Sequence, residues 1–109
     1  MIIFDKNAIV NSENPEEIEK SEELNPAVLT CGLSLKSTIT ASSINDSGFQ
    51  YCIQRGFFKH DGGLVLPQEF SIRWTKKPEN IYPYLAAVTL LILNGISPND
   101  ISNNLKFCN

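Results

Sequence analysis

The feature that most constrains the fold is residues 80–95, NIYPYLAAVTLLILNG, which begin with polar residues and then become apolar on every face of a helix. Asn80 can cap such a helix, Pro83 falls in its first turn, and Gly95 suits the left-handed residue that ends it. The helix would be roughly 24 Å long. Because no face is polar along its length, we expect it to be buried in the core.

Length and composition indicate one globular domain. The chain has 109 residues, of which 42% are hydrophobic and 19% charged, and these values favour neither a disordered nor a membrane protein. The net charge is only −3 and the lysines and arginines are scattered, so we expect no nucleic-acid partner. The longest apolar run, residues 85–93, is shorter than the roughly 20 residues that cross a bilayer, so we expect no membrane partner either.

The cysteines and the histidine predict no bound metal. Cys31, Cys52 and Cys108 form no CxxC pair, which indicates neither a disulfide framework nor a zinc site. His60 is the only histidine, and no second histidine or cysteine pair stands at ligand spacing from it. Residues 1–5 lack the basic start and the apolar stretch of a signal peptide. The sequence therefore predicts a cytoplasmic protein without a metal ion or other cofactor.

The N-terminal third predicts one parallel crossover unit, residues 8–32. Residues 8–10 form a short β-prone segment, and the glutamate-rich residues 15–24, which begin with a proline after a cap residue, predict a surface helix. Residues 27–32 are an almost unbroken apolar run, which is typical of a strand covered on both faces of a sheet. Strand, helix and strand in this order predict a βαβ unit.

Residues 37–75 predict a three-stranded antiparallel meander. A segment rich in serine and threonine and residues 49–58, in which apolar and polar residues alternate, flank the turn cluster of residues 45–48. A second turn leads into a third alternating strand, in which Pro67 should mark a bulge or a sheet edge.

Residues 80–107 predict a helical hairpin. After the buried helix, Ser97, Pro98 and Asp100 provide the cap, the first-turn proline and the acidic N3 residue of a short last helix. Residues 1–109 together predict a single α/β domain: a short parallel βαβ unit plus a three-stranded antiparallel sheet packed on a long buried helix.

Taken in order, these segments resemble the second half of the central domain of the Mur ligases, the ATP-dependent enzymes that add amino acids to UDP-N-acetylmuramate in peptidoglycan synthesis. Residues 8–14 (AIVNSEN) resemble the family's "vvNaDd" strand end, residues 28–33 (VLTCGL) its "vitfGl", and residues 38–44 (TITASSI) its "aditAeni" strand. The closest match is residues 80–87 (NIYPYLAA), which are similar to the family's "HNvyNalAA". The resemblance covers nearly the whole chain and implies a fold like that of the Mur ligase central domain.

The departures from the family pattern argue against catalysis by this chain alone. The family's phosphate-binding loop, G-x-x-G-K-[ST], lies upstream of the matching half and is absent here. The family's acidic and histidine residues for metal and phosphate, its modified lysine and its two outer domains are also missing. Without a loop and a cation to neutralise charge during phosphoryl transfer, magnesium-ATP has no anchor. The sequence therefore predicts no catalytic residue and argues against ATP binding.

The resemblance implies two nucleotide-contact candidates, Asn80 and Asn11. Asn80 keeps the first asparagine of the family motif, but Glu79 stands in the place of its histidine. Pro83 replaces the second asparagine, which contacts adenine in the family, and a proline ring has no amide to pair with a base edge. The alternative is that Asn80 caps the helix and makes no nucleotide contact.

The aromatic residues provide the interface candidates. Most are expected in the core, whereas Phe57, Phe58 and Trp74 are expected at an exposed surface that binds a partner. A chain that holds only half of a sheet would also expose an edge strand and apolar surface, which self-association would cover.

We therefore expect a non-catalytic Mur-ligase-like module that binds a protein partner or forms a homo-oligomer in bacterial cell-wall metabolism. The alternative is one part of a split ATP-dependent Mur-type amide ligase whose phosphate-binding half is a separate chain. A third possibility is a nucleotide-sensing domain. A neighbouring reading frame with the missing loop would favour the split enzyme.

Overall fold

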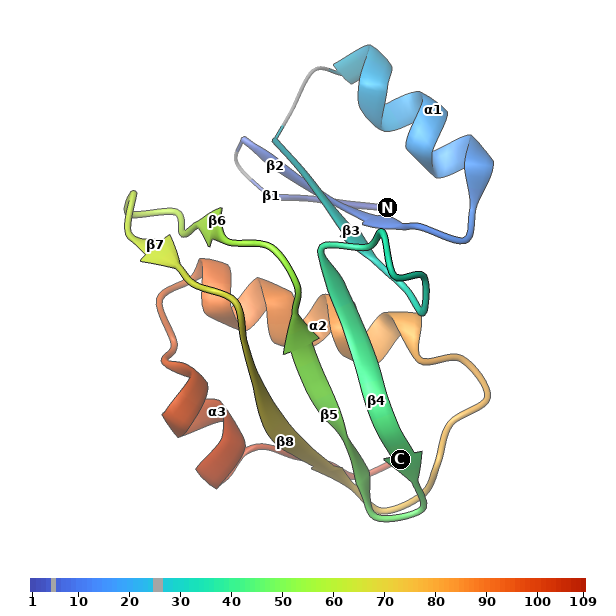
Figure 1. The fold of residues 1–109 in the computed structure, drawn as a ribbon, viewed down its shortest axis with the longest axis vertical. Helices are drawn as coiled ribbons and strands as arrows, with labels where there is room; N and C mark the ends of the chain where they lie inside the picture. The colour runs from blue at the N-terminus through green and yellow to red at the C-terminus, as the bar shows by residue number, and fades with distance from the viewer. Residues whose placement is uncertain (5, 25–26) are drawn as a thin grey trace.

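The computed structural model describes residues 1–4, 6–24 and 27–109, which contain three helices and nine strands (Figure 1). In chain order the elements are β1 (Ile2–Phe4), β2 (Asn7–Asn11), α1 (Pro15–Leu24), β3 (Ala27–Cys31), β4 (Ile39–Asn45), β5 (Gly48–Ile53), β6 (Phe57–Phe58), β7 (Leu64–Val65), β8 (Gln68–Trp74), α2 (Tyr82–Leu93), α3 (Pro98–Asn104) and β9 (Lys106–Phe107).

Seven strands form one mixed sheet in the order β1-β2-β3-β4-β5-β8-β9, and β6 and β7 pair separately as a short hairpin. β2, α1 and β3 form the parallel crossover unit, and β3 is also parallel to β4. β5 is antiparallel to both of its neighbours, β4 and β8. The predicted α/β fold, a βαβ unit joined to three antiparallel strands, is confirmed.

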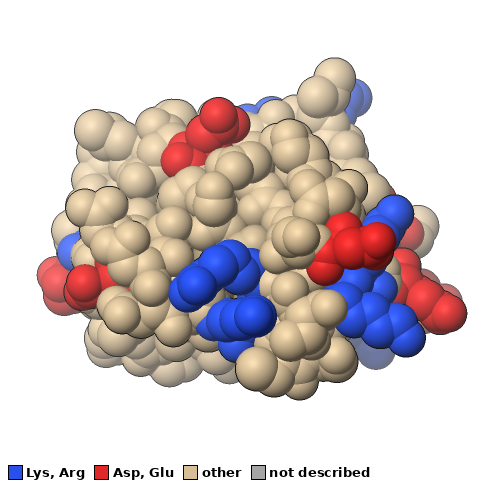
Figure 2. All heavy atoms as spheres, turned by 90° about the horizontal axis from the view of Figure 1, so that it is seen from below, with Lys and Arg blue, Asp and Glu red and all other residues tan. Residues whose placement is uncertain are grey.

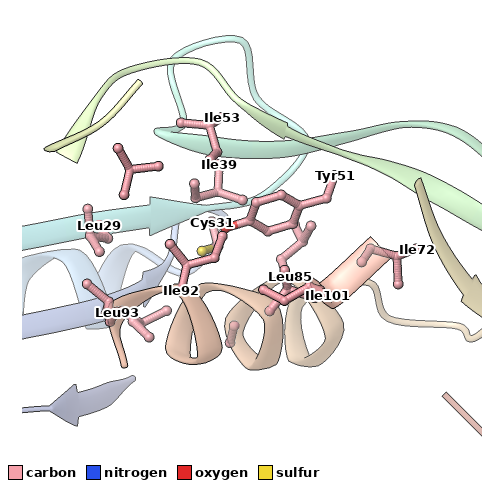
Figure 3. Packing of buried hydrophobic residues seen from close by; sticks show 14 of the residues in the cluster. Leu29, Cys31, Ile39, Tyr51, Ile53, Ile72, Leu85, Ile92, Leu93 and Ile101 are labelled. Carbon is pink, nitrogen blue, oxygen red and sulfur yellow. The ribbon is translucent and has the colours of Figure 1, made fainter. Parts of the chain in front are cut away.

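The core lies between the sheet and α2, which crosses one sheet face (Figure 1). Figure 3 shows Leu85 and Ile92 of α2 pointing toward Ile39 and Tyr51 of the sheet. Along β5 the residues facing α2 are buried and those between them are only partly covered. The alternation in the sequence therefore predicted the inner face of this strand correctly.

The central helix is buried on one side rather than on every face. Its sheet-facing residues are fully covered, but Ala87, Leu90 and Leu91 are only half-buried, because the sheet lies on one side of the helix. The helix also begins at Tyr82, later than expected, while Gly95 ends it with a positive φ of 90° as predicted.

The helix ends that depend on local hydrogen bonds match the sequence predictions. The Asn14 side chain accepts hydrogen bonds from the backbone N–H groups of Glu16 and Glu17 at 3.1 and 3.4 Å, directly before the proline that begins α1. The Ser97 hydroxyl accepts one from the Asp100 N–H at 3.1 Å at the start of α3. Both are capping interactions within one turn.

Strand β3 differs from the prediction. Leu29 and Cys31 are buried against α2, but Val28 on the opposite face is 37% exposed. The prediction of cover on both faces was wrong because α1 packs on β2 rather than over β3.

Two short pairings were not predicted. β1 adds an antiparallel strand beside β2, and β9 adds a parallel strand beside β8. The β6–β7 hairpin forms about the predicted second turn but pairs separately from the main sheet. Pro67 lies in the bend between β7 and β8, so the predicted bulge or edge position was wrong. No helix in the described part of the chain is long and apolar enough to span a bilayer.

Candidate functional site

The two predicted nucleotide contacts lie at the same end of the domain. Asn11 ends β2 and Asn80 precedes α2. The Tyr82 hydroxyl, in the first turn of α2, donates to the backbone oxygen of Ile9 at 3.2 Å and so holds the start of the helix against β2. Ligands of open α/β sheets bind at this carboxyl edge of parallel strands.

Both asparagines are used in local turns. The Asn11 side-chain oxygen accepts a hydrogen bond from the Glu13 N–H at 3.0 Å, and the Asn80 side-chain oxygen accepts one from the Tyr82 N–H at 3.1 Å. Asn80 therefore shapes the entry to α2 from two residues before it, while Ile81 occupies the cap position itself.

The carboxyl edge is closed by contacts between the ends of β2 and β3. The Ser12 hydroxyl lies 3.2 Å from the backbone oxygen of Cys31 and 2.8 Å from the hydroxyl of Ser37, which is almost fully buried. A side chain at Gly32 would overlap the Ser12 hydroxyl oxygen, so this hydroxyl would have to move from its present position. The loop that follows β3 therefore folds back onto β2.

Two carboxylates follow β2 at this edge. Glu13 accepts a hydrogen bond from the Leu33 N–H at 3.3 Å, and Glu17 accepts one from the Asn14 side chain at 3.1 Å. Burial by itself raises the pKa of Glu17, but hydrogen bonds from the N-terminal ammonium group and from the Asn11 N–H outweigh it and lower the pKa. The Glu17 carboxylate is thus ionised and paired with the N-terminal ammonium group.

The thiols within the fold are not activated. Cys31 is fully buried, and burial raises its pKa to about 12 although its hydrogen bond with Thr89 lowers it. Burial also raises the pKa of the half-buried Cys52. Nucleophilic cysteines have lowered pKa values. The described residues contain no group of three or more histidine, cysteine or acidic side chains close enough to hold a metal ion.

Two of the three predicted interface residues are buried. Trp74 is only 2% exposed, its indole N–H donates to the backbone oxygen of Asn45 at 2.7 Å, and its ring packs on Phe49. Phe57 is buried with its cross-strand partner Val65. The prediction that Trp74 and Phe57 are exposed was wrong, because strand alternation turns both toward the core.

The third candidate, Phe58, belongs to an exposed apolar surface, here named the Phe58 patch. Its members are 43% to 64% exposed. Three of them, Leu64, Leu66 and Ile96, line a hollow of about 280 Å³ between the β6–β7 hairpin and the turn after α2, and Phe58 lies beside it as the cross-strand partner of Leu64. The patch comprises Phe58, Leu64, Leu66 and Ile96. The apolar run of residues 64–66 was the sequence signal that could have identified it.

Comparisons with known proteins were made at the levels of sequence and structure. No family model and no curated protein matches this chain. Among solved structures, a crystal structure of MurF from Acinetobacter baumannii matches with a TM-score of 0.59 and 20% identity, covering 94% of this chain and 21% of that one. A structure of UDP-N-acetylmuramoylalanyl-D-glutamyl-2,6-diaminopimelate--D-alanyl-D-alanyl ligase from the same organism matches with the same values.

The match confirms at the level of fold the resemblance that the sequence motifs indicate. The aligned region is nearly the whole of this chain, but this chain spans only about a fifth of the length of the ligase structures, 21%. The chain thus has the fold of one part of a Mur ligase.

Proposed function

We propose that this chain is a non-catalytic Mur-ligase-like module that forms a homodimer through the Phe58 patch and acts in peptidoglycan metabolism. The observation that carries the proposal is the clustering of three large, exposed apolar side chains around one hollow, with the exposed Phe58 directly opposite one of them on the hairpin. Isolated exposed apolar residues are normal, whereas a contiguous apolar patch favours an interaction site.

The patch combines a projecting side chain with a cavity, as a two-fold interface requires. Phe58 pairs directly with Leu64 across the hairpin, so the two side chains share one face, and Leu64 also lines the hollow. The hollow of about 280 Å³ exceeds the roughly 150 Å³ that holds a benzene ring. In a two-fold dimer each Phe58 can therefore enter the hollow of the other copy.

The carboxyl edge supports the non-catalytic part of the proposal. The Glu13 carboxylate is held at this edge by the Leu33 N–H, the Glu17 carboxylate pairs with the N-terminal ammonium group, and the hydroxyls of Ser12 and Ser37 bond each other. Transfer of a phosphoryl group requires positive charge around the transferred oxygens.

Sedimentation equilibrium over a range of protein concentrations tests the dimer. We expect a concentration-dependent dimer for the unmodified chain and a shift toward monomer for Phe58→Ser, with the dissociation constant raised roughly tenfold or more, as for an aromatic residue at the centre of an interface. Leu35→Ser is the matched control, because Leu35 is 88% exposed but lies outside the patch.

A monomer at all concentrations, or an equal effect of both substitutions, would disprove the proposed dimer. A different protein partner would give a monomeric chain whose binding to that partner is weakened by Phe58→Ser. Circular dichroism of each variant verifies that the fold is retained, because both residues are on the surface.

The second candidate function is one part of a split Mur-type ligase. It is favoured by the alignment of 94% of this chain with a MurF structure and by the shared edge of Asn11 and Asn80. ATP turnover by this chain mixed with a separate chain that supplies the phosphate-binding loop would support the split ligase. No turnover by the mixture would favour the non-catalytic module.

A further inference from the structure

The pairing of β8 with β9 places two positive charges directly opposite each other. Arg73 is the register partner of Lys106, and both side chains are exposed. The next pair, Trp74 and Phe107, packs against the core on the α2 side. Because side chains alternate along a strand, Arg73 and Lys106 project from the opposite face. Two like charges held side by side repel each other, and an anion bound between them would relieve the repulsion.

Neither Arg73 nor Lys106 forms an ion pair with an acidic side chain among the described residues, although the chain has 12 acidic residues. One guanidinium nitrogen of Arg73 donates to the backbone oxygen of Asn103 at 3.2 Å, which orients the group and leaves its other N–H groups available. The Lys106 ammonium group makes no hydrogen bond to the described residues.

The two cations border a hollow that is large enough for a small ligand. Its volume is about 420 Å³, and its lining includes Arg73, Lys106 and the hydroxyl-bearing residues Ser47 and Thr75. Figure 2 views the molecule from the end where β8 and the chain finish, and shows lysine and arginine side chains beside uncharged surface, with acidic side chains also on this face. One carboxylate, that of Asp46, also lines the hollow and opposes anion binding.

We propose that the hollow between Arg73 and Lys106 binds an oxyanion, the phosphate or carboxylate group of a small molecule. A guanidinium group presents parallel N–H donors that match two oxygens of such a group, and a lysine adds a point charge beside it. The site shares no residue with the Phe58 patch, so it is independent of the proposed dimer.

The simpler interpretation is that Lys106 protects the sheet edge. β9 is the last strand of the sheet, and a lysine on an edge strand discourages pairing with other chains. This interpretation explains Lys106 but requires neither Arg73 opposite it nor a hollow between them, and it predicts no saturable anion binding.

Nuclear magnetic resonance titration of the full chain with inorganic phosphate, at constant ionic strength, tests the site. We expect saturable shifts of the backbone amides of Ser47, Thr75 and Lys106. Arg73→Gln and Lys106→Gln should each weaken the apparent affinity roughly tenfold, as expected for a lost hydrogen bond to a charged group. Asp46→Asn should strengthen binding, because it removes the opposing charge.

Lys36→Gln is the matched control, since Lys36 is an exposed lysine in the loop between β3 and β4. A parallel titration with acetate distinguishes the two ligand classes, and tighter binding of phosphate identifies a phosphate group. Shifts that stay linear with both anions, or equal effects of Lys36→Gln and Lys106→Gln, would overturn the proposal. All four positions are exposed on the surface, and the amide spectrum of each variant verifies its fold.

Discussion

The hydroxyl oxygens of Tyr51 and Thr89 lie 2.7 Å apart in the centre of the core, where both side chains are fully buried. The Thr89 hydroxyl donates to the backbone oxygen of Leu85, one turn earlier in α2, at 2.7 Å. Its single hydrogen is then used, so the Tyr51 hydroxyl must donate to Thr89. The bond joins β5 to the central helix and satisfies the phenol group in an otherwise apolar environment.

Replacement of Thr89 by valine should therefore destabilise the fold although the side-chain volume hardly changes. The Tyr51 hydroxyl would be left buried without its acceptor, at a cost of roughly 1–3 kcal/mol in the free energy of unfolding. Urea unfolding measures this quantity. Tyr51→Phe combined with Thr89→Val should recover much of the loss, because neither polar group then remains unpaired. Additive losses in the double variant would contradict this account.

The stability of the fold should decrease at alkaline pH. Burial raises the pKa of Cys31 from 9.0 to about 12 and that of Tyr82 from 10.0 to about 12. The folded state thus holds these protons more tightly than the unfolded chain. This contribution to stability is complete below about pH 9 and is lost as the pH rises through about 12. Urea unfolding at a series of pH values between these limits should show the decrease.

Cys31→Val should make the pH dependence less steep, because the thiol that titrates in the unfolded chain is removed. Cys108→Val, at an exposed position, serves as the control and should leave the slope of stability against pH unchanged. An unchanged slope in the Cys31 variant would contradict the assignment.

Gly48→Ala should lower the free energy of unfolding more than most other glycine-to-alanine substitutions in this chain. A side chain at Gly48, whose φ is +157°, would overlap the backbone oxygen of Ile72 on β8. We expect a loss of roughly 2 kcal/mol or more, since the backbone of a central strand pair must shift. Gly62→Ala is the matched control, because Gly62 also has positive φ but no heavy atom within 4 Å, and it should cost about 1 kcal/mol. Thermal unfolding of both variants tests whether the steric contact adds to the backbone cost.

Magnesium-ATP at millimolar concentration should leave the backbone amide signals of Asn11 and Asn80 in place. The Glu13 carboxylate, which accepts a hydrogen bond from the Leu33 N–H, adds negative charge at this edge and disfavours a polyphosphate. Shifts confined to residues around Lys106 would instead indicate the phosphate group at the proposed oxyanion site. Saturable shifts at both asparagines would contradict this prediction and support the hypothesis of a nucleotide-sensing domain.

The features that depend on short stretches of sequence were predicted well. Ser97 caps α3 and Gly95 ends α2, because both interactions lie within a few residues of each other. The alternation in residues 49–53 predicted which face of β5 is buried. The ordered Mur-like motifs predicted the fold that the structural match confirms.

The features that depend on distant partners were not predicted. The exposure of Phe58 and the burial of Trp74 were decided by the position of each side chain relative to the α2 side of the sheet. The outer face of β3 remains exposed to solvent because α1 packs on β2 instead.

By itself the sequence determined the types and order of the main elements, since periodicity and caps act within one helix or strand. The tertiary structure alone decided the short edge strands and brought Arg73 opposite Lys106, residues far apart in the chain. Two- and three-residue strands have little intrinsic preference, and only the hydrogen bonds and the burial supplied by a neighbouring strand stabilise them.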